Sequence, residues 1–160
     1  MKLITNPQTL AELNNWADKF VKRIQVELQN KSINASGNLS NSLTYEIVDE
    51  GDTTHIKVYA ANYLIYAEGG RKAGKIPANF VSILEDWIAD KGLSVPSQFK
   101  NARQFAGAIA YNIKTYGSRR KRDNDIADVV APAMNELYPK LQQLLEARVV
   151  MYINDHLYDN

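Results

Sequence analysis

Residues 43–60 read LTYEIVDEGDTTHIKVYA, and this stretch decides the fold class. Two runs within it alternate apolar and polar side chains, a pattern typical of strands with one buried face. The segment DEGD at residues 49–52 separates the two runs and is rich in turn-forming residues. The pattern therefore predicts an antiparallel β-hairpin over residues 43–60.

Helical periodicity flanks the hairpin on both sides. Before it, apolar residues recur at helical spacing over 7–30, with Asn6 as a cap and Pro7 at the first position. Thr9 and Glu12 offer an alternative capping box one turn later. After the hairpin, the same spacing predicts three helices, over residues 77–91, 97–116 and about 126–157.

Signals at the helix ends refine these three predictions. Ser97 is a candidate cap for the second helix, and Gly92 and Gly117 are candidate stops. Pro132 and Pro139 interrupt the last pattern, so that helix either starts late or bends. The order of elements defines an α+β fold, and a length of 160 residues predicts a single domain spanning 1–160.

Composition excludes several classes of protein. The chain is 45% hydrophobic and 23% charged, as in ordinary globular proteins. It has no cysteine and only two histidines, His55 and His156, so neither a disulfide framework nor a metal site is expected. No signal peptide is recognisable and no apolar run is long enough for a membrane span. We therefore expect a cytosolic protein without a metal or cofactor.

Charge is distributed unevenly along the chain. Residues 97–122 hold seven Lys and Arg and no acid, whereas residues 123–160 hold seven Asp and Glu against two basic residues. These segments carry +7 and −5, although the whole chain carries only +1. Such separation favours an anionic partner at one surface, or head-to-tail attraction between copies of the chain.

Residues 69–76, GGRKAGKI, match most of a phosphate-binding loop. The position that should carry a Ser or Thr hydroxyl for Mg²⁺ is Ile76, and Pro77 then removes a backbone N–H donor. The sequence also lacks a G-x-S-x-G motif or a cysteine nucleophile. We therefore expect no nucleotide binding and no enzyme activity.

A longer stretch around this motif resembles a known family. Residues 61–77, ANYLIYAEGGRKAGKIP, resemble a signature of tailed-bacteriophage neck proteins, the tail-completion or head–tail connector family. Three flanking segments are also similar to that family: SGNLSNSL at 36–43, AGAIAYNIKTYG at 106–117 and VVAPA at 129–133. The resemblance covers residues 36–145, with Ala73 and Ala78 in place of the usual prolines.

The resemblance implies a structural protein of the virion. Such proteins form rings between the portal and the tail, coaxial with the DNA channel, after assembly in the host cytoplasm. The implied partners are further copies of the chain, the portal or adaptor protein, tail proteins and, without sequence preference, packaged DNA. A ring needs two different complementary patches on each subunit.

The segment from Tyr63 to Lys75 suits one of these patches. Its candidate contact residues are Tyr63, Tyr66, Glu68, Gly69, Gly70, Arg71, Lys72 and Lys75. The tyrosines are amphipathic anchors of the kind enriched at interfaces, and Glu68 can pair with Arg71 of a neighbouring copy. In the alternative interpretation, both tyrosines lie in the core and the glycines form a plain strand-to-helix turn.

The basic run that follows Gly117 has three interpretations. Its residues are Arg119, Arg120, Lys121 and Arg122. The run is a solvated loop, a contact to an acidic neighbour, or a contact to DNA phosphates without sequence preference, because no aromatic residue interleaves it. The alternative function for the whole chain is accordingly a small DNA-binding module that uses the basic segment 97–122.

Overall fold

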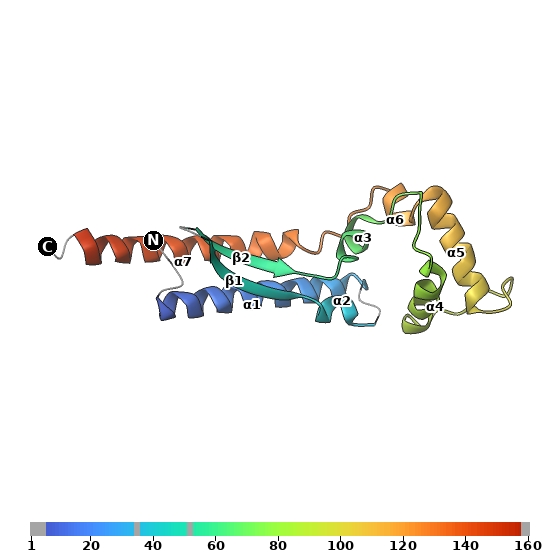
Figure 1. Cartoon of the computed structure of the whole chain (residues 1–160), viewed down its shortest axis with the longest axis horizontal. Coiled ribbons are helices and arrows are strands. Elements are labelled where there is room, and N and C mark those ends of the chain that lie inside the picture. The colour runs from blue at the N-terminus through green and yellow to red at the C-terminus, as the bar shows by residue number, and fades with distance from the viewer. Residues whose placement is uncertain (1–5, 34–35, 51–52, 158–160) are drawn as a thin grey trace. The chain divides into compact units, whose positions relative to one another are not determined.

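The computed structural model describes residues 6–33, 36–50 and 53–157, without the side chains of 151–157 (Figure 1). The chain divides into two compact units. Unit 1 comprises Met1–Leu28, Ser42–Ala60 and Val129–Asn160, and unit 2 comprises Gln29–Asn41 and Ala61–Asp128. The single domain expected from chain length stays a prediction.

The hairpin is the centre of unit 1. Strands β1 (Thr44–Glu50) and β2 (Thr53–Tyr59) pair antiparallel, from Thr44 opposite Tyr59 to Glu50 opposite Thr53. This pairing confirms the predicted hairpin, whose turn residues Gly51 and Asp52 lie outside the described residues. The order of helix, hairpin and further helices ending in a long one confirms the α+β class.

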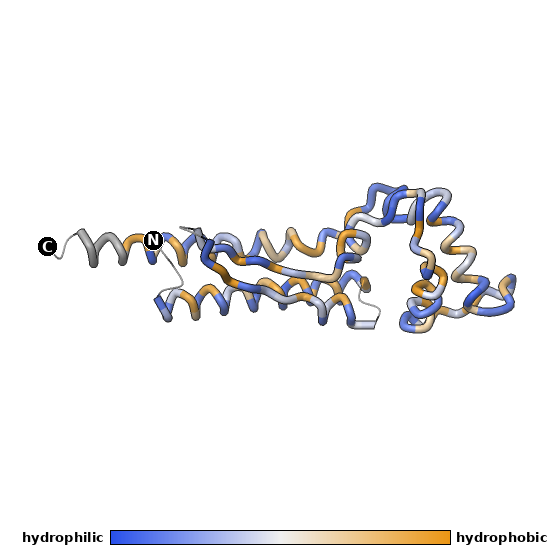
Figure 2. Tube along the Cα trace, in the orientation of Figure 1, coloured by the Kyte–Doolittle hydropathy of each residue, from blue (hydrophilic) through white to orange (hydrophobic). Residues whose placement is uncertain are grey.

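Helices α1 (Pro7–Asn30) and α7 (Ala131–Leu157) supply most of the buried residues of unit 1. Apolar residues recur along both helices (Figure 2). The fully buried residues include Leu13, Ala17, Ile24 and Leu28 of α1 and Ala133 and Leu137 of α7. The indole N–H of Trp16 donates to the carbonyl of Leu137 at 2.7 Å, which fixes α1 against α7.

Two ion pairs join the same helices. Arg23 donates to Glu136 at 2.8 Å and also contacts Glu27, while Arg148 donates to Glu12 at 3.2 Å. The hydrogen bond from Arg23 lowers the pKa of Glu136 below its ordinary value. Arg148 is buried, and pairing with Glu12 removes the cost of burying its charge alone.

Unit 2 is helical among its described residues. It contains α2 (Asn38–Asn41), α3 (Leu64–Gly69), α4 (Phe80–Asp90), α5 (Ala102–Tyr116) and α6 (Arg119–Arg122). Its core joins Leu84 and Ile88 of α4 to Ala106 and Ala110 of α5, and Ile76 and Phe105 pack against them. The two alanines present little side-chain bulk, so α5 can approach α4 closely.

Helix starts differ from the sequence-based boundaries. The helix predicted from residue 77 begins at Phe80, and the one predicted from 97 begins at Ala102. Asn101 caps that helix by accepting from the backbone N–H of Gln104, so the prediction of Ser97 as its cap was wrong. Asn6 caps α1 as predicted, since its side chain accepts from the N–H groups of Gln8 and Thr9.

The proline and glycine signals mark the start of α7 and the ends of α4 and α5. Pro132 lies in the first turn of α7, so this helix starts late, while Pro139 lies inside it without ending it. Gly92 and Gly117 follow α4 and α5 with φ of 61° and 81°, as predicted for helix stops. Among the described residues, no helix is both long and apolar enough to cross a membrane.

Candidate functional site

The predicted contact segment begins on α3, which presents apolar side chains at the surface. Tyr63, Ile65 and Tyr66 are 45%, 73% and 50% exposed, and we call these three residues the α3 face. The interpretation that placed both tyrosines in the core was therefore wrong. Tyr63, at the N-cap of α3, is three residues from Tyr66, so these two rings share one side of the helix, and Ile65 projects from another side. Exposed large apolar side chains gathered on one helical turn are typical of a contact surface.

Backbone hydrogen bonds hold the turn after α3 against the junction of α5 and α6. Gly74 N–H donates to the carbonyl of Lys114, and Ser118 N–H donates to that of Arg71, both at 2.8 Å. Arg71 N–H in turn donates to the hydroxyl of Ser118 at 2.9 Å. The two candidate segments, Tyr63–Lys75 and Arg119–Arg122, therefore belong to one surface, although they are more than forty residues apart in sequence.

Two glycines permit this close approach of backbones. Gly70 has φ of 70° and ψ of 176°, and a Cβ there would lie 2.5 Å from Ser118 Oγ and 2.7 Å from Lys121 N. Gly117 has φ of 81°, and its Cβ would lie 2.9 Å from the carbonyl of Arg71. Only glycine adopts this backbone region readily.

Arg71 is engaged within its own chain. Its guanidinium carbon lies 4.9 Å from the ring centroid of Tyr66 and 5.4 Å from that of Phe80. It also donates to the carbonyl of Lys75 at 3.0 Å. These contacts fix the turn and the Tyr66 ring, whereas a pair between Arg71 and Glu68 of another copy stays a prediction.

The basic run forms a short helix, α6, rather than an irregular loop. Arg122 donates to the carbonyl of Gly117 at 3.0 Å, and Arg119 lies 3.4 Å from Asp123. Together with the turn and the end of α5, α6 forms what we call the basic surface. It consists of Arg71, Lys72, Lys75, Lys114, Arg119, Arg120, Lys121 and Arg122.

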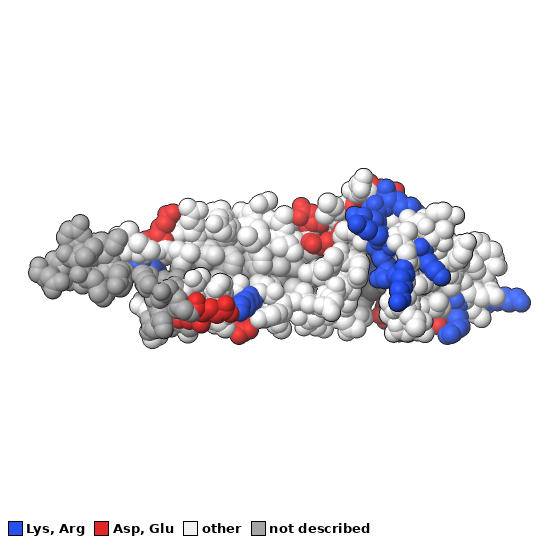
Figure 3. Space-filling view, turned by 45° about the horizontal axis from the view of Figure 1, so that its top comes forward, with Lys and Arg blue, Asp and Glu red and all other residues white. Residues whose placement is uncertain are grey.

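Charge therefore separates by unit as well as by sequence. Unit 2 contains twelve Lys and Arg against seven Asp and Glu, a net charge of +5. Unit 1 contains seven Lys and Arg against eleven Asp and Glu, a net charge of −4. Figure 3 shows Lys and Arg side chains gathered on unit 2.

The resemblance to a phosphate-binding loop has no counterpart in the geometry. The N–H of Gly74, which would have to face a phosphate, donates to Lys114 instead. Ile76 packs against the core of α4 and α5. Within the described ranges, no three His, Cys, Asp or Glu side chains come together as metal ligands.

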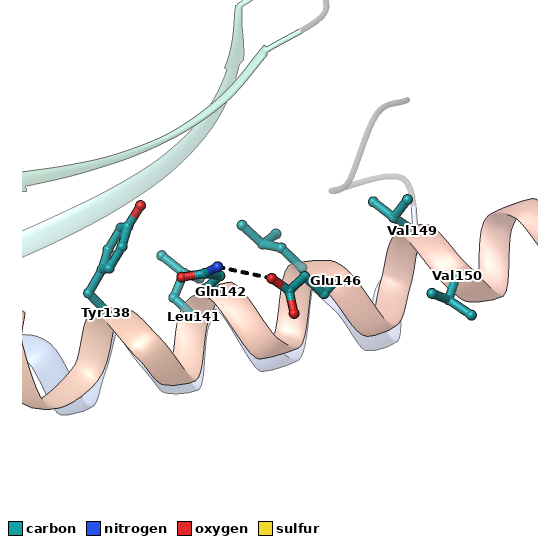
Figure 4. Close-up of a pocket in the computed structure, with 7 residues that line it drawn as sticks. Tyr138, Leu141, Gln142, Glu146, Val149 and Val150 are labelled. Carbon is teal, nitrogen blue, oxygen red and sulfur yellow. Dashed lines mark hydrogen bonds between the residues drawn. The ribbon is translucent and has the colours of Figure 1, made fainter.

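A second surface feature lies on unit 1 and was missed by sequence reasoning. A depression of about 320 Å³ is lined by residues of α1, β2 and α7: Leu13, Trp16, Phe20, Thr54, Ile56, Val58, Met134, Tyr138, Leu141 and Leu145. Another, of about 400 Å³, continues along α7 to Val149 and Val150 (Figure 4). They share Tyr138, Leu141 and Leu145, and we call them together the α7 groove.

The lining of the α7 groove is almost entirely apolar. Tyr138, Val149 and Val150 are 54%, 47% and 56% exposed. Gln142 and Glu146 are the polar residues in the depression that continues along α7. The side-chain amide of Gln142 donates to the carboxylate of Glu146 at 2.9 Å (Figure 4). A continuous apolar strip of this kind is typical of a surface that binds another protein segment.

Comparison with protein-family models, with curated proteins and with solved structures gives no match.

Proposed function

We propose that this protein is a structural subunit of a tailed bacteriophage that assembles into a ring at the head–tail junction. It serves there as a connector, tail-completion or tail-terminator protein, between the portal or adaptor and the tail. The resemblance of residues 36–145 to neck proteins supports the virion part of this proposal. The α+β order of elements fits the resemblance as well.

One observation carries the assembly part of the proposal. A single chain bears two unlike surfaces: the α3 face beside the basic surface in a unit of charge +5, and the α7 groove in a unit of charge −4. Head-to-tail contacts require two different complementary surfaces on each subunit, and they generate rings when the rotation closes. The opposite net charges of the two units that carry these surfaces favour such contacts over identical pairing.

Electron microscopy of the purified protein, combined with light scattering, tests this proposal. We expect closed rings whose formation weakens as salt increases, because the attraction between exposed charges is screened. Symmetric dimers, or open chains at every concentration, would contradict ring assembly. A binding assay with the portal protein of a candidate phage tests the position at the head–tail junction. The rings should bind one end of the portal.

The basic surface also favours the second candidate, a DNA-binding module, because eight Lys and Arg from three segments gather there. Such a surface binds phosphates without reading bases, and its affinity falls steeply with salt. A gel shift with duplex DNA separates the candidates. A sequence-selective shift that persists at high salt requires base contacts beyond this surface and supports the DNA-binding module, whereas weak, salt-sensitive binding agrees with a ring around packaged DNA.

A variant with Arg119, Arg120, Lys121 and Arg122 all replaced by Ser tests the role of α6. Arg119, Lys121 and Arg122 are exposed and Arg120 is half-buried, and Arg122 alone contacts Gly117, so the melting temperature should change little. Assembly or DNA binding should nevertheless weaken. An unfolded variant would show that α6 is structural, and unchanged assembly and DNA binding would exclude α6 from both contacts.

A further inference from the structure

We infer that the α7 groove of one copy receives the α3 face of the next copy. This inference rests on the proposed head-to-tail assembly and names the two surfaces that meet. The α3 face was expected from the sequence to be one half of a subunit contact, and the groove supplies a candidate for the other half. Shape, apolar character and charge support this pairing.

The groove offers an apolar strip along one side of α7. Tyr138, Leu141, Leu145 and Val149 are spaced by three or four residues, so they project from the same side of the helix. Tyr138 and Val149 point to the same side in Figure 4. β2 and α1 provide further apolar lining through Ile56, Val58 and Trp16. The strip therefore suits a short apolar segment.

The α3 face has the matching properties. Ile65 is the most exposed large apolar residue described, at 73%. Tyr66 follows it directly in sequence and Tyr63 lies two residues before it, and Arg71 holds the Tyr66 ring in place. Rigid aromatic anchors lose little conformational freedom on binding, so this helical turn is preorganised for insertion into a groove.

Charge selects a second copy, in head-to-tail orientation, as the occupant. The groove belongs to the unit with a net charge of −4, and Glu146 is part of its rim. The α3 face belongs to the unit with +5 and is followed directly by Arg71, Lys72 and Lys75. Contacts of groove with groove, or of α3 with α3, would bring like charges together. Only the unlike pairing joins opposite charges.

Because the chain has no cysteine, site-directed cross-linking can test this pairing cleanly. Two variants, Ile65→Cys and Val149→Cys, carry tags of different size and are mixed with a short bismaleimide. We expect a covalent heterodimer in the mixture and little cross-linking within either variant alone. Ser94→Cys and Gln143→Cys serve as matched controls, because both positions are exposed and lie outside the two surfaces.

A complementation experiment provides an independent readout. Ile65→Glu and Val149→Glu change exposed side chains, so both variants should stay folded, as circular dichroism will check. Each should weaken self-association by about 30-fold or more if it removes an anchor of the contact. The mixture retains one intact contact for each pair of chains, so it should form 1:1 heterodimers and nothing larger.

The outcomes separate this inference from the proposed function. Wild-type rings that persist in both Glu variants, without the Ile65–Val149 cross-link, would overturn the inference and leave ring assembly intact. The cross-link and the heterodimer without rings would support the inference and overturn the ring. Cross-linking of each Cys variant with itself at equal yield would show symmetric pairing and overturn the inference.

Discussion

Gly70 shows how a single residue controls the candidate site. Its φ of 70° and ψ of 176° place the carbonyl of Arg71 and the hydroxyl of Ser118 within reach of their hydrogen-bond partners. A side chain at this position meets both an unfavourable backbone conformation and the atoms of α6. The sequence alone marked the glycine as a turn residue, but the partner segment could not be read from local spacing.

Replacing this glycine should therefore loosen the junction. We expect Gly70→Ala to destabilise the fold by about 1–3 kcal/mol from backbone strain alone. The matched control is Gly107→Ala in α5, where an added Cβ meets no atom within 4 Å. Alanine is the better helix former there, by up to about 1 kcal/mol. Thermal unfolding should show opposite shifts, and equal shifts would contradict the packing described for Gly70.

The pair of Arg23 and Glu136 predicts a dependence of stability on pH. The pKa of Glu136 in the folded state lies below its ordinary value of 4.5, mainly because of the hydrogen bond from Arg23. A lowered carboxylate pKa stabilises the fold above pH 4.5, and this contribution disappears as the pH falls through the folded-state value. Glu136→Gln should thus lower the melting temperature slightly at pH 7.

The difference between wild type and Glu136→Gln should close as the pH drops below 4.5. Because Glu136 is exposed and Arg23 only half-buried, we expect a small effect that salt reduces. Melting curves in an Arg23→Gln background provide the control, since Glu136→Gln should change little there at any pH. A difference that persists at pH 2–3 would show that Glu136 acts through packing instead of charge.

At the level of elements, the sequence predicted the segments whose patterns are long and regular. The hairpin and α1 follow from alternation and from helical spacing with a recognisable cap. Helices α3 and α6 were missed because four to six residues cannot sustain a helix alone. The hydrogen bonds that hold the turn after α3 to the junction of α5 and α6 join Arg71 with Ser118 and Gly74 with Lys114, and local patterns do not reveal them.

The α7 groove was missed for a different reason. Apolar residues of α7 occur on more than one side of the helix, so spacing did not distinguish the side facing the core from the side lining the groove. Leu137 is buried against α1, whereas its neighbour Tyr138 is half exposed. The surplus of apolar residues was a signal that could have indicated a second contact surface.

Pro139 provides a test of α7 itself. It lies in the ninth position of the helix and has no N–H to donate to the carbonyl of Asn135. Pro139→Ala should therefore stabilise the protein by about 1–3 kcal/mol, as the gain in the helix exceeds the added freedom of the unfolded chain. Pro132→Ala is the control, because a proline in the first turn forgoes no helical hydrogen bond. Equal effects of both changes would contradict the assigned start of α7.

For the whole molecule, the two units raise the question of whether they unfold together. The 68 residues from Ala61 to Asp128 separate β2 from α7. If unit 2 unfolded alone, unit 1 would have to close a flexible loop of that length, at a cost of about 4 kcal/mol. This coupling favours one cooperative transition, as expected of a single domain.

The two tryptophans can report on the units separately, because Trp16 belongs to unit 1 and Trp87 to unit 2. Trp87→Phe leaves only the first reporter and Trp16→Phe only the second. Circular dichroism reports the overall unfolding of each variant. In each variant we expect the fluorescence melting curve to have the same midpoint as the circular dichroism melting curve. Midpoints that differ within one variant between fluorescence and circular dichroism would show independent units.

Because unit 1 is discontinuous in sequence, the ribosome synthesises its parts at different times. Residues 60–130 separate Tyr59 from the first residue of α7, and at about 5–20 residues per second their synthesis takes about 4–14 s. During that interval the apolar residues of α1 and the hairpin emerge without the helix that covers them, while all of unit 2 has been synthesised by residue 128. Translation therefore favours folding of the basic unit first, and the nascent acidic unit is the part that a chaperone would have to shield.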